Sequence, residues 1–194
     1  MSENHVTFYF AYNSPYAFLA NTRIEDEVAP LGVTVDYVPV YHPRTGGGPD
    51  MNSPRIRYIF EDFARFAEAY GIALDRGPFA DTGGACRGFL FARAAGQGKP
   101  YHDRVYEALW LAGKDIGDDQ ILVAIAEESG LDREAFLDAI KPDSPFASEL
   151  EQCNEEAEAD GVFGFPFFVY EGHKFWGNDR IEWLVREIRK YHKG

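Results

Sequence analysis

The chain has 194 residues, a formal net charge of −13 at pH 7, and a hydrophobic content of 45% that includes 16 Phe and 11 Tyr. This length suits one compact domain, with or without an insertion, and the apolar content is ample for a sizeable core. The acidic balance argues against a nucleic-acid partner, which requires a basic face, and against an anionic membrane surface. It leaves an anionic small substrate open, because local charges in a cleft decide that affinity.

The sequence carries no signal for export, membrane insertion or metal binding. The start MSENHVTFYF lacks a basic segment followed by a long apolar one, and no apolar run approaches the roughly 20 residues that cross a bilayer. Cys86 and Cys153 lie far apart and outside any C-x-x-C motif, so neither a disulfide framework nor a dithiol centre is expected. The five histidines show no metal-binding spacing. We therefore expect a cytoplasmic protein with reduced thiols and no metal.

The N-terminal forty residues predict a strand, a helix and a second strand. Residues 6–12, VTFYFAY, alternate and are rich in aromatic side chains, which is typical of a β-strand. Asn13 or Ser14 is expected to cap a helix that has Pro15 in its first turn and runs to about residue 30. Residues 33–40, VTVDYVPV, predict the second strand, parallel to the first through a right-handed crossover.

The middle of the chain predicts only helices. Residues 41–54 form a glycine- and proline-rich loop without a phosphate-binding motif. No linker separates two independent domains, so the helices are most simply an insertion between two halves of one sheet. Apolar spacing places these helices around residues 59–67 and over 85–95, 101–112, 118–128, 132–140 and 145–160.

The C-terminal stretch GVFGFPFFVYEGHKFWGNDR predicts a hairpin and a final helix. Pro166 cannot donate to a sheet, so it sits at or before the start of the strand at 167–170. Gly172 marks a two-residue turn, followed by a strand at 173–176. Asn178 is expected to cap the last helix. By local pattern alone, this stretch is equally well a plain β-hairpin.

Three separated blocks carry a family resemblance. They read FYFAYNSPYAFLA, DIGDDQILVAIAEESGLDREAF and DGVFGFPFFVYEGHKFWGNDRIEWL. In this order they resemble the DsbA-related family that contains 2-hydroxychromene-2-carboxylate isomerases and kappa-class glutathione transferases. The resemblance spans nearly the whole chain and implies an α/β, DsbA-like fold. Residues 1–54 and 161–194 would form a thioredoxin-like domain with a mixed four-stranded sheet, and residues 55–160 a helical insertion domain. It also implies a homodimer and glutathione as cofactor.

Ser14 is the candidate catalytic residue. An N-cap serine needs no function, and neither a Ser-His-Asp arrangement nor G-x-S-x-G supports a hydrolase. Redox members of the superfamily begin a C-x-x-C at this helix start, whereas this chain has Ser14-Pro15-Tyr16-Ala17, so dithiol chemistry is lost. A hydroxyl at a helix N-terminus still has a use, because it donates to a bound thiolate that the helix end also favours. The resemblance implies that this thiolate belongs to glutathione.

The resemblance also assigns the residues that bind glutathione. Pro166 corresponds to the family's cis-proline, and Phe165 before it binds the cysteinyl part through its main chain. The segment Gly177, Asn178, Asp179 and Arg180 corresponds to the site of the γ-glutamyl end, with Asp179 pairing the amino group. Locally, a helix cap with an exposed charge pair describes this segment equally well.

A second set of residues is assigned to carboxylates and to the substrate. Asn52 and Arg55 match a family segment whose cation meets a carboxylate of the substrate or of glutathione. Tyr16 and Trp176 are expected to line the substrate cavity. Trp110 is better explained as a core residue.

The resemblance implies a glutathione-dependent isomerase of the 2-hydroxychromene-2-carboxylate type. Its mechanism would be addition of the thiolate to a small aromatic or unsaturated carboxylate, ring opening, bond rotation and elimination, which restores glutathione. The alternatives are a kappa-like glutathione transferase and a non-redox thioredoxin-like binding protein. A disulfide oxidoreductase is the least favoured reading, because C-x-x-C is missing.

Overall fold

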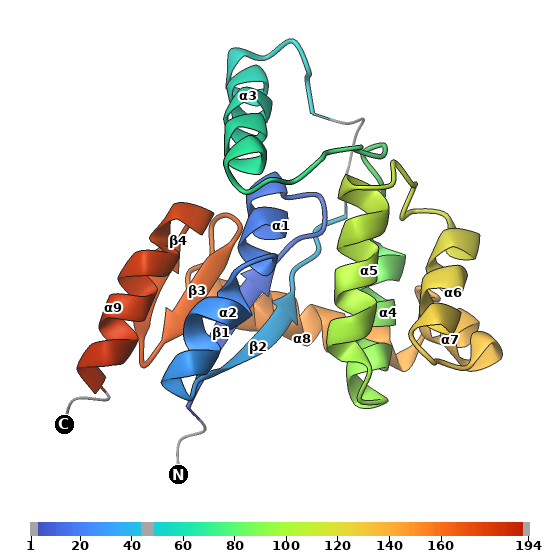
Figure 1. Ribbon diagram of the computed structural model, residues 1–194. Coiled ribbons are helices and arrows are strands. Elements are labelled where there is room, and N and C mark those ends of the chain that lie inside the picture. Colours follow the sequence, from blue (N-terminus) through green and yellow to red (C-terminus); the bar gives the residue numbers. More distant parts are fainter. Residues whose placement is uncertain (1–3, 44–48, 192–194) are drawn as a thin grey trace. The chain divides into compact units, whose positions relative to one another are not determined.

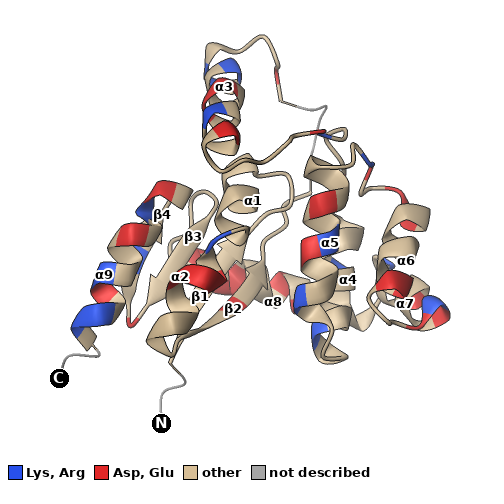
Figure 2. Ribbon diagram, viewed as in Figure 1, with Lys and Arg blue, Asp and Glu red and all other residues tan. Residues whose placement is uncertain are grey.

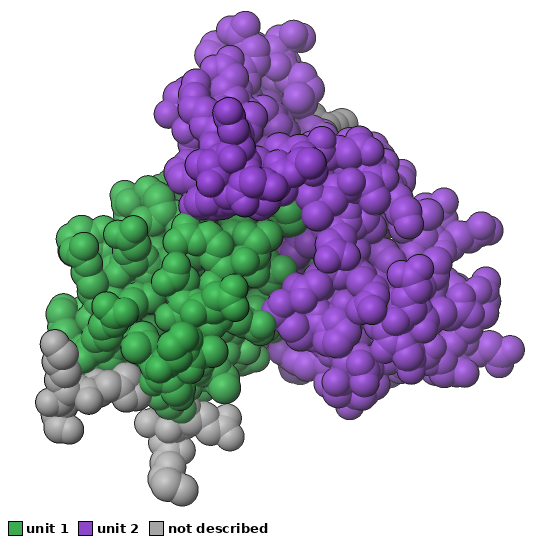
Figure 3. Space-filling view, in the orientation of Figure 1, with its two compact units in different colours: residues 1–40, 155–194 green, residues 41–154 purple. Residues whose placement is uncertain are grey.

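The computed structural model describes residues 4–43 and 49–191. The chain divides into two compact units, shown in different colours in Figure 3. Unit 1 comprises Met1–Val40 and Glu155–Gly194, and unit 2 comprises Tyr41–Asn154. The first and last residues of unit 2 are joined, because the Asn154 amide donates to the Tyr41 carbonyl at 2.8 Å and accepts from the Tyr41 N–H at 3.0 Å.

Unit 1 is built on a mixed four-stranded sheet of order β2-β1-β3-β4 (Figure 1). Parallel pairing joins β1 and β2, and antiparallel pairing joins β1 to β3 and β3 to β4. The predicted parallel pair, hairpin and mixed sheet are therefore confirmed. The strands are β1 (His5–Phe10), β2 (Thr34–Pro39), β3 (Phe167–Tyr170) and β4 (His173–Trp176).

The two faces of the sheet differ in chemistry. On one face Phe8 packs with ring centroids 4.8 Å from Phe168 and 5.5 Å from Tyr37, which makes an aromatic core. On the other face the Tyr9 hydroxyl lies 2.7 Å from Asp160 Oδ2, just beyond α8 (Pro145–Ala159). Burial and this carboxylate raise the pKa of Tyr9, so the phenol stays protonated and anchors the end of α8 to the sheet.

The helix expected up to residue 30 is interrupted in the structure. It divides into α1 (Pro15–Asn21), α2 (Ile24–Val28) and a 3-10 turn η1 (Ala29–Leu31). Arg23 has φ −132°, outside the helical range, and the Thr22 hydroxyl donates to the Leu19 carbonyl at 2.8 Å, so the chain turns between α1 and α2. The expectation of one continuous helix was wrong, because apolar periodicity does not register such a turn.

The C-terminal elements follow the prediction except at the start of the last helix. Glu171 and Gly172 both have positive φ, which is the conformation of a primed two-residue hairpin turn. A 3-10 turn η2 (Asn178–Arg180) precedes α9 (Ile181–Tyr191), and Gly177 occupies the cap position. Asn178 is 3% exposed inside that turn, so its expected role as the N-cap of the final helix was wrong.

The secondary-structure elements described in unit 2 are all helices, and each helix expected from the sequence is present. At its centre α4 packs against α5, α6 and α7. Gly88 of α4 permits this approach, because an added Cβ would lie 2.4 Å from the Tyr101 hydroxyl. Trp110 is fully buried against Phe63, which confirms its expected core position. The helices are α3 (Pro54–Ala69), α4 (Gly83–Ala94), α5 (Gly98–Trp110), α6 (Asp119–Glu128), α7 (Arg133–Ala139) and the greater part of α8.

The charged side chains, cysteines, helices and metal-ligating groups of the described chain each bear on an expectation from the sequence. Both signs of charge are interleaved on α3 and α9 in the view of Figure 2. Cys86 and Cys153 are buried thiols that form no disulfide, and burial raises the pKa of the Cys86 thiol to about 12. Among described residues, no helix has the length and apolarity needed to span a bilayer. No group of three or more metal-ligating side chains gathers in the same residues.

Ser14 caps α1, which predicts a measurable structural contribution. Its Oγ accepts the Ala17 N–H at 3.2 Å. Ser14→Ala is expected to lower the free energy of unfolding by about 1 kcal/mol, the usual cost of losing an N-cap. Urea denaturation measures this, with Asp132→Ala at the cap of α7 as a matched control. An unfolded Ser14→Ala protein would contradict a simple cap.

His102 predicts acid sensitivity of the fold. It is fully buried with its ring 4.8 Å from Tyr106, and burial, aided by Lys99, lowers its pKa well below the usual value. The unfolded chain therefore binds a proton at His102 that the folded chain does not bind. Because of this difference, the free energy of unfolding falls as the pH drops below about 6.5. The expected loss is at most roughly 1.4 kcal/mol per pH unit below that point.

The His102 prediction is checked by urea denaturation at about pH 7.5 and about pH 5.5. His102→Phe should lose less stability than wild type between these values, because it has no site to protonate. His42→Gln at an exposed histidine is the control. An equal loss in wild type and His102→Phe would contradict the prediction.

Candidate functional site

Ser14 lies at the N-terminus of α1, after β1, with extended backbone angles of φ −85° and ψ 116°. While its Oγ accepts the Ala17 N–H, the hydroxyl donates to the carbonyl of Phe165 at 3.1 Å. Pro15 fills the first helical position, where its missing N–H costs nothing. The side chain is only half-buried, so the hydroxyl is available to a ligand.

The Phe165–Pro166 peptide bond is cis, which confirms the geometry expected at this proline. Pro166 is buried, and its carbonyl accepts the Gly177 N–H at 3.0 Å. One loop therefore contacts both Ser14 and the turn η2. Because η2 also packs against α1, the structure gathers Ser14, Phe165, Pro166 and the segment 177–180 at one end of unit 1.

The segment 177–180 has a geometry that only glycine at its start permits. Gly177 has φ +112°, and an added Cβ would lie 2.6 Å from Asp179 Oδ1. Asp179 pairs with Arg180 at 2.7 Å, and both side chains are 50% exposed, so water weakens the pair. Asn178 is buried, and its Nδ2 has no hydrogen-bond partner.

Asn52 and Arg55 belong to unit 2. They flank the start of α3, where the Asn52 N–H donates to Asp50 Oδ1 at 3.0 Å and both side chains are exposed. The structure brings these two predicted residues together at one helix start. The other predicted site residues all belong to unit 1.

Trp176 and Tyr16 are both accessible, and an aromatic neighbour of Trp176 was missed from the sequence. Phe163 is 70% exposed, and its ring lies 4.8 Å from that of Trp176. Gly164 makes room beside Trp176, since an added Cβ would meet the indole nitrogen at 2.7 Å. The missed signal was the hairpin register, which pairs Phe167 with Trp176 and brings the aromatic residues before Pro166 to the same edge.

The residues of unit 1 fit a bound glutathione in three respects. The Phe165 carbonyl faces the helix start, where a peptide N–H pairs with the residue before a cis-proline. The buried Nδ2 of Asn178 is a donor without a protein acceptor, which a ligand carboxylate satisfies. Asp179 supplies an exposed carboxylate for an ammonium group.

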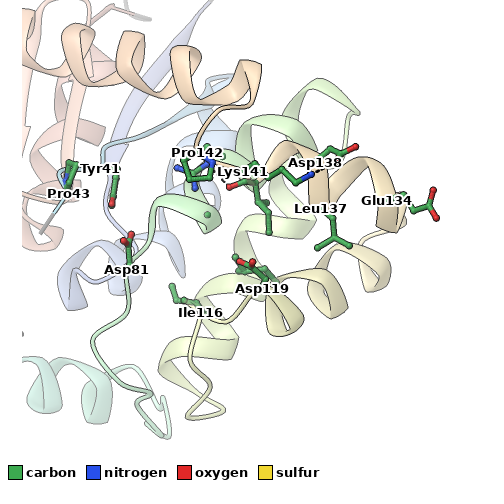
Figure 4. A pocket seen from close by; sticks show the side chains of 15 residues that line it. Tyr41, Pro43, Asp81, Ile116, Asp119, Glu134, Leu137, Asp138, Lys141 and Pro142 are labelled. Atoms are coloured by element: carbon green, nitrogen blue, oxygen red, sulfur yellow. Dashed lines mark hydrogen bonds and ion pairs between the residues drawn. The ribbon is translucent and has the colours of Figure 1, made fainter.

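Unit 2 contains a separate cavity of about 890 Å³ (Figure 4), which includes none of the residues predicted from the sequence. Several of its polar groups are engaged with one another. Arg87 Nε donates to the Ile140 carbonyl at 2.7 Å, and Lys141 pairs with Asp138 at 2.6 Å. Burial and a hydrogen bond to Asp81 raise the pKa of Tyr41 to about 12. The Tyr41 phenol is therefore protonated near neutral pH.

Comparisons with known proteins match this fold along nearly the whole chain. A family model described as a DSBA-like thioredoxin domain matches residues 5–189. A 2-hydroxychromene-2-carboxylate isomerase of Sphingobium xenophagum is 30% identical over 92% of this chain and 95% of its own. A solved 2-hydroxychromene-2-carboxylate isomerase has a TM-score of 0.87 at 25% identity, covering 97% of this chain and 96% of its own.

A more distant solved structure shares the fold alone. The cytosolic disulfide reductase DsbM from Pseudomonas aeruginosa, solved with GSH, has a TM-score of 0.69 at 17% identity and covers 97% of each chain. The fold, the cis-proline and the matches along nearly the whole chain all indicate the same family. The chain belongs to the DSBA-like thioredoxin family, among relatives named 2-hydroxychromene-2-carboxylate isomerase.

Proposed function

We propose that the protein is a glutathione-dependent isomerase of the 2-hydroxychromene-2-carboxylate type, in which Ser14 stabilises the thiolate of bound glutathione. The observation that carries the proposal is the hydrogen bond from Ser14 Oγ to the Phe165 carbonyl, beside a cis-proline and a helix N-terminus. The names of the relatives support isomerisation, and the DsbM structure with GSH supports a glutathione ligand on this fold.

The Ser14 hydroxyl has one hydrogen, so ligand binding requires an exchange of partners. When that hydrogen turns to a thiolate at the start of α1, the Phe165 carbonyl loses its donor. The Phe165 carbonyl would then accept the N–H of the cysteinyl residue, because a peptide pairs with such a carbonyl in the manner of an added strand. Ser14 Oγ continues to accept from Ala17, so every polar group keeps a partner.

The energy needed for this step is within the reach of the residues present. A thiol has a pKa of about 8.5, so lowering it by two units makes most of it thiolate at neutral pH. Each unit requires about 1.4 kcal/mol. A hydrogen bond to a charge contributes roughly 1.5–3 kcal/mol, and a helix N-terminus adds about 0.3–1 kcal/mol. Glutathione itself supplies a nucleophile that adds to the unsaturated substrate and later leaves unchanged.

The remaining assignments place the ends of glutathione and the substrate. Asn178 Nδ2 and the N–H groups of η2 would hold the γ-glutamyl carboxylate, and Asp179 would exchange its exposed partner Arg180 for the amino group. A small aromatic or unsaturated carboxylate would contact Trp176 and Tyr16. Asn52 and Arg55 would meet a carboxylate of either molecule.

Calorimetry with reduced glutathione tests the thiolate. Wild type is expected to bind in the micromolar to low-millimolar range and to release a proton near neutral pH. Ser14→Ala should retain binding through Phe165 and η2 but lose proton release, since the donor to sulfur is gone. Titrations in two buffers with different ionisation enthalpies measure the released proton, and Asp132→Ala is the folded control. No binding at several millimolar glutathione would refute the proposal.

Turnover of 2-hydroxychromene-2-carboxylate distinguishes the proposed isomerase from its alternatives. The free-thiol concentration should stay constant while substrate is converted, because glutathione is regenerated. Ser14→Ala should lower kcat by at least about tenfold, the worth of one hydrogen bond to a charged sulfur. Stoichiometric loss of thiol would indicate a kappa-like transferase instead. Glutathione binding without turnover of this substrate would favour a non-redox binding protein.

A further inference from the structure

Arg76 lies between α3 and α4 of unit 2, with its guanidinium among three aromatic rings. Its Cζ is 3.6 Å from the ring centre of Phe79, 5.2 Å from that of Phe60 and 5.3 Å from that of Trp110. Nε and Nη2 are buried without a hydrogen-bond partner. Within residues 4–43 and 49–191, no carboxylate forms an ion pair with Arg76.

The backbone on either side of Arg76 is fixed to the end of α5. The Asp75 N–H donates to the Trp110 carbonyl at 3.0 Å, and the Gly77 N–H donates to the Leu109 carbonyl at 2.6 Å. A Cβ at Gly77 would lie 2.1 Å from a neighbouring backbone oxygen, so only glycine fits there. The backbone segment that carries the Arg76 side chain is therefore held in place against the end of α5.

A guanidinium in this setting lacks the partners that such groups normally have. Burial lowers the pKa of Arg76, which shows that its charge is poorly compensated. Cation–π contacts compensate part of the cost, but they leave the N–H donors unused. Two other arginines of unit 2 have partners: Arg93 pairs with Glu149 at 3.0 Å, and Arg87 donates to a backbone carbonyl at 2.7 Å.

We propose that Arg76 binds the carboxylate of a flat, aromatic ligand. A guanidinium N–H donates a charge-assisted hydrogen bond to a carboxylate, and Nη1, which is not among the buried unpaired atoms, is the donor open to a ligand. Phe60 and Phe79 are half-buried, so they retain surface on which an attached ring packs. This assignment rests on the proposed function for the chemical class of the ligand.

The experiment uses a stable flat probe, chromone-2-carboxylate, and uncharged chromone, titrated by calorimetry without glutathione. Wild type should bind the carboxylate more tightly than chromone. Arg76→Met should weaken the carboxylate by at least about tenfold, the worth of one charged hydrogen bond, and leave chromone nearly unchanged. Arg65→Met is the matched control, because Arg65 stacks on Tyr58 but already pairs with Glu61 and Asp62.

Other outcomes overturn the assignment. Equal carboxylate affinity in wild type and Arg76→Met, or no preference of wild type for the carboxylate over chromone, would reduce Arg76 to a structural contact between the rings and the end of α5. If Arg76→Met fails to fold, Arg76→Lys decides, since it keeps the charge but not the guanidinium that lies among the three rings. Wild-type affinity in Arg76→Lys would equally refute the site.

Glutathione titrations on the same variants separate this site from the proposed function. Arg76→Met should bind glutathione as wild type does, and Ser14→Ala should bind chromone-2-carboxylate as wild type does. Loss of carboxylate binding with intact glutathione binding in Arg76→Met would show that Arg76 serves the carboxylate and not glutathione. Absence of glutathione binding in wild type, with carboxylate binding intact, would instead refute the glutathione enzyme.

Discussion

The hydrogen bond between Ser14 Oγ and the Phe165 carbonyl joins segments 151 residues apart in the chain. It fixes the start of α1 against the cis-proline loop, and the Pro166 carbonyl extends the connection to Gly177 and η2. Helix start, loop and turn therefore depend on one another. A ligand that takes the Ser14 hydrogen must return a donor to Phe165, and a peptide thiol such as glutathione offers both groups.

Arg76 presents the opposite electrostatic situation. Ser14 has an internal partner that a ligand replaces, whereas the Nε and Nη2 atoms of Arg76 have none and sit among rings. A polar group that already has a hydrogen-bond partner favours ligands that replace this partner at little cost. An unsatisfied buried donor favours any ligand that brings an acceptor. The two proposed sites thus differ in kind, one for a peptide thiol in unit 1 and one for a carboxylate in unit 2.

Local sequence signals were sufficient for most of the fold. Alternation predicted the strands, Gly172 predicted the hairpin turn, and Asn13 or Ser14 before Pro15 predicted the cap of α1, which is Ser14. The break near Arg23 and the burial of Asn178 were not predictable, because both depend on how short helical turns pack within unit 1. Phe163 and Arg76 were missed for a related reason. The pairing of Phe163 with Trp176 and the unpaired guanidinium of Arg76 both arise from tertiary packing, which local sequence patterns do not reveal.

The paired hydrogen bonds between Asn154 and Tyr41 have a topological consequence. They bring the first and last residues of the 114-residue unit 2 together. The two ends of this insertion into unit 1 are therefore hydrogen-bonded to each other. Such an insertion behaves as a single large loop, whose closure cost grows only slowly with its length. Helices can therefore be gained, lost or exchanged within this insertion while the strand register of the sheet and the position of Ser14 stay the same.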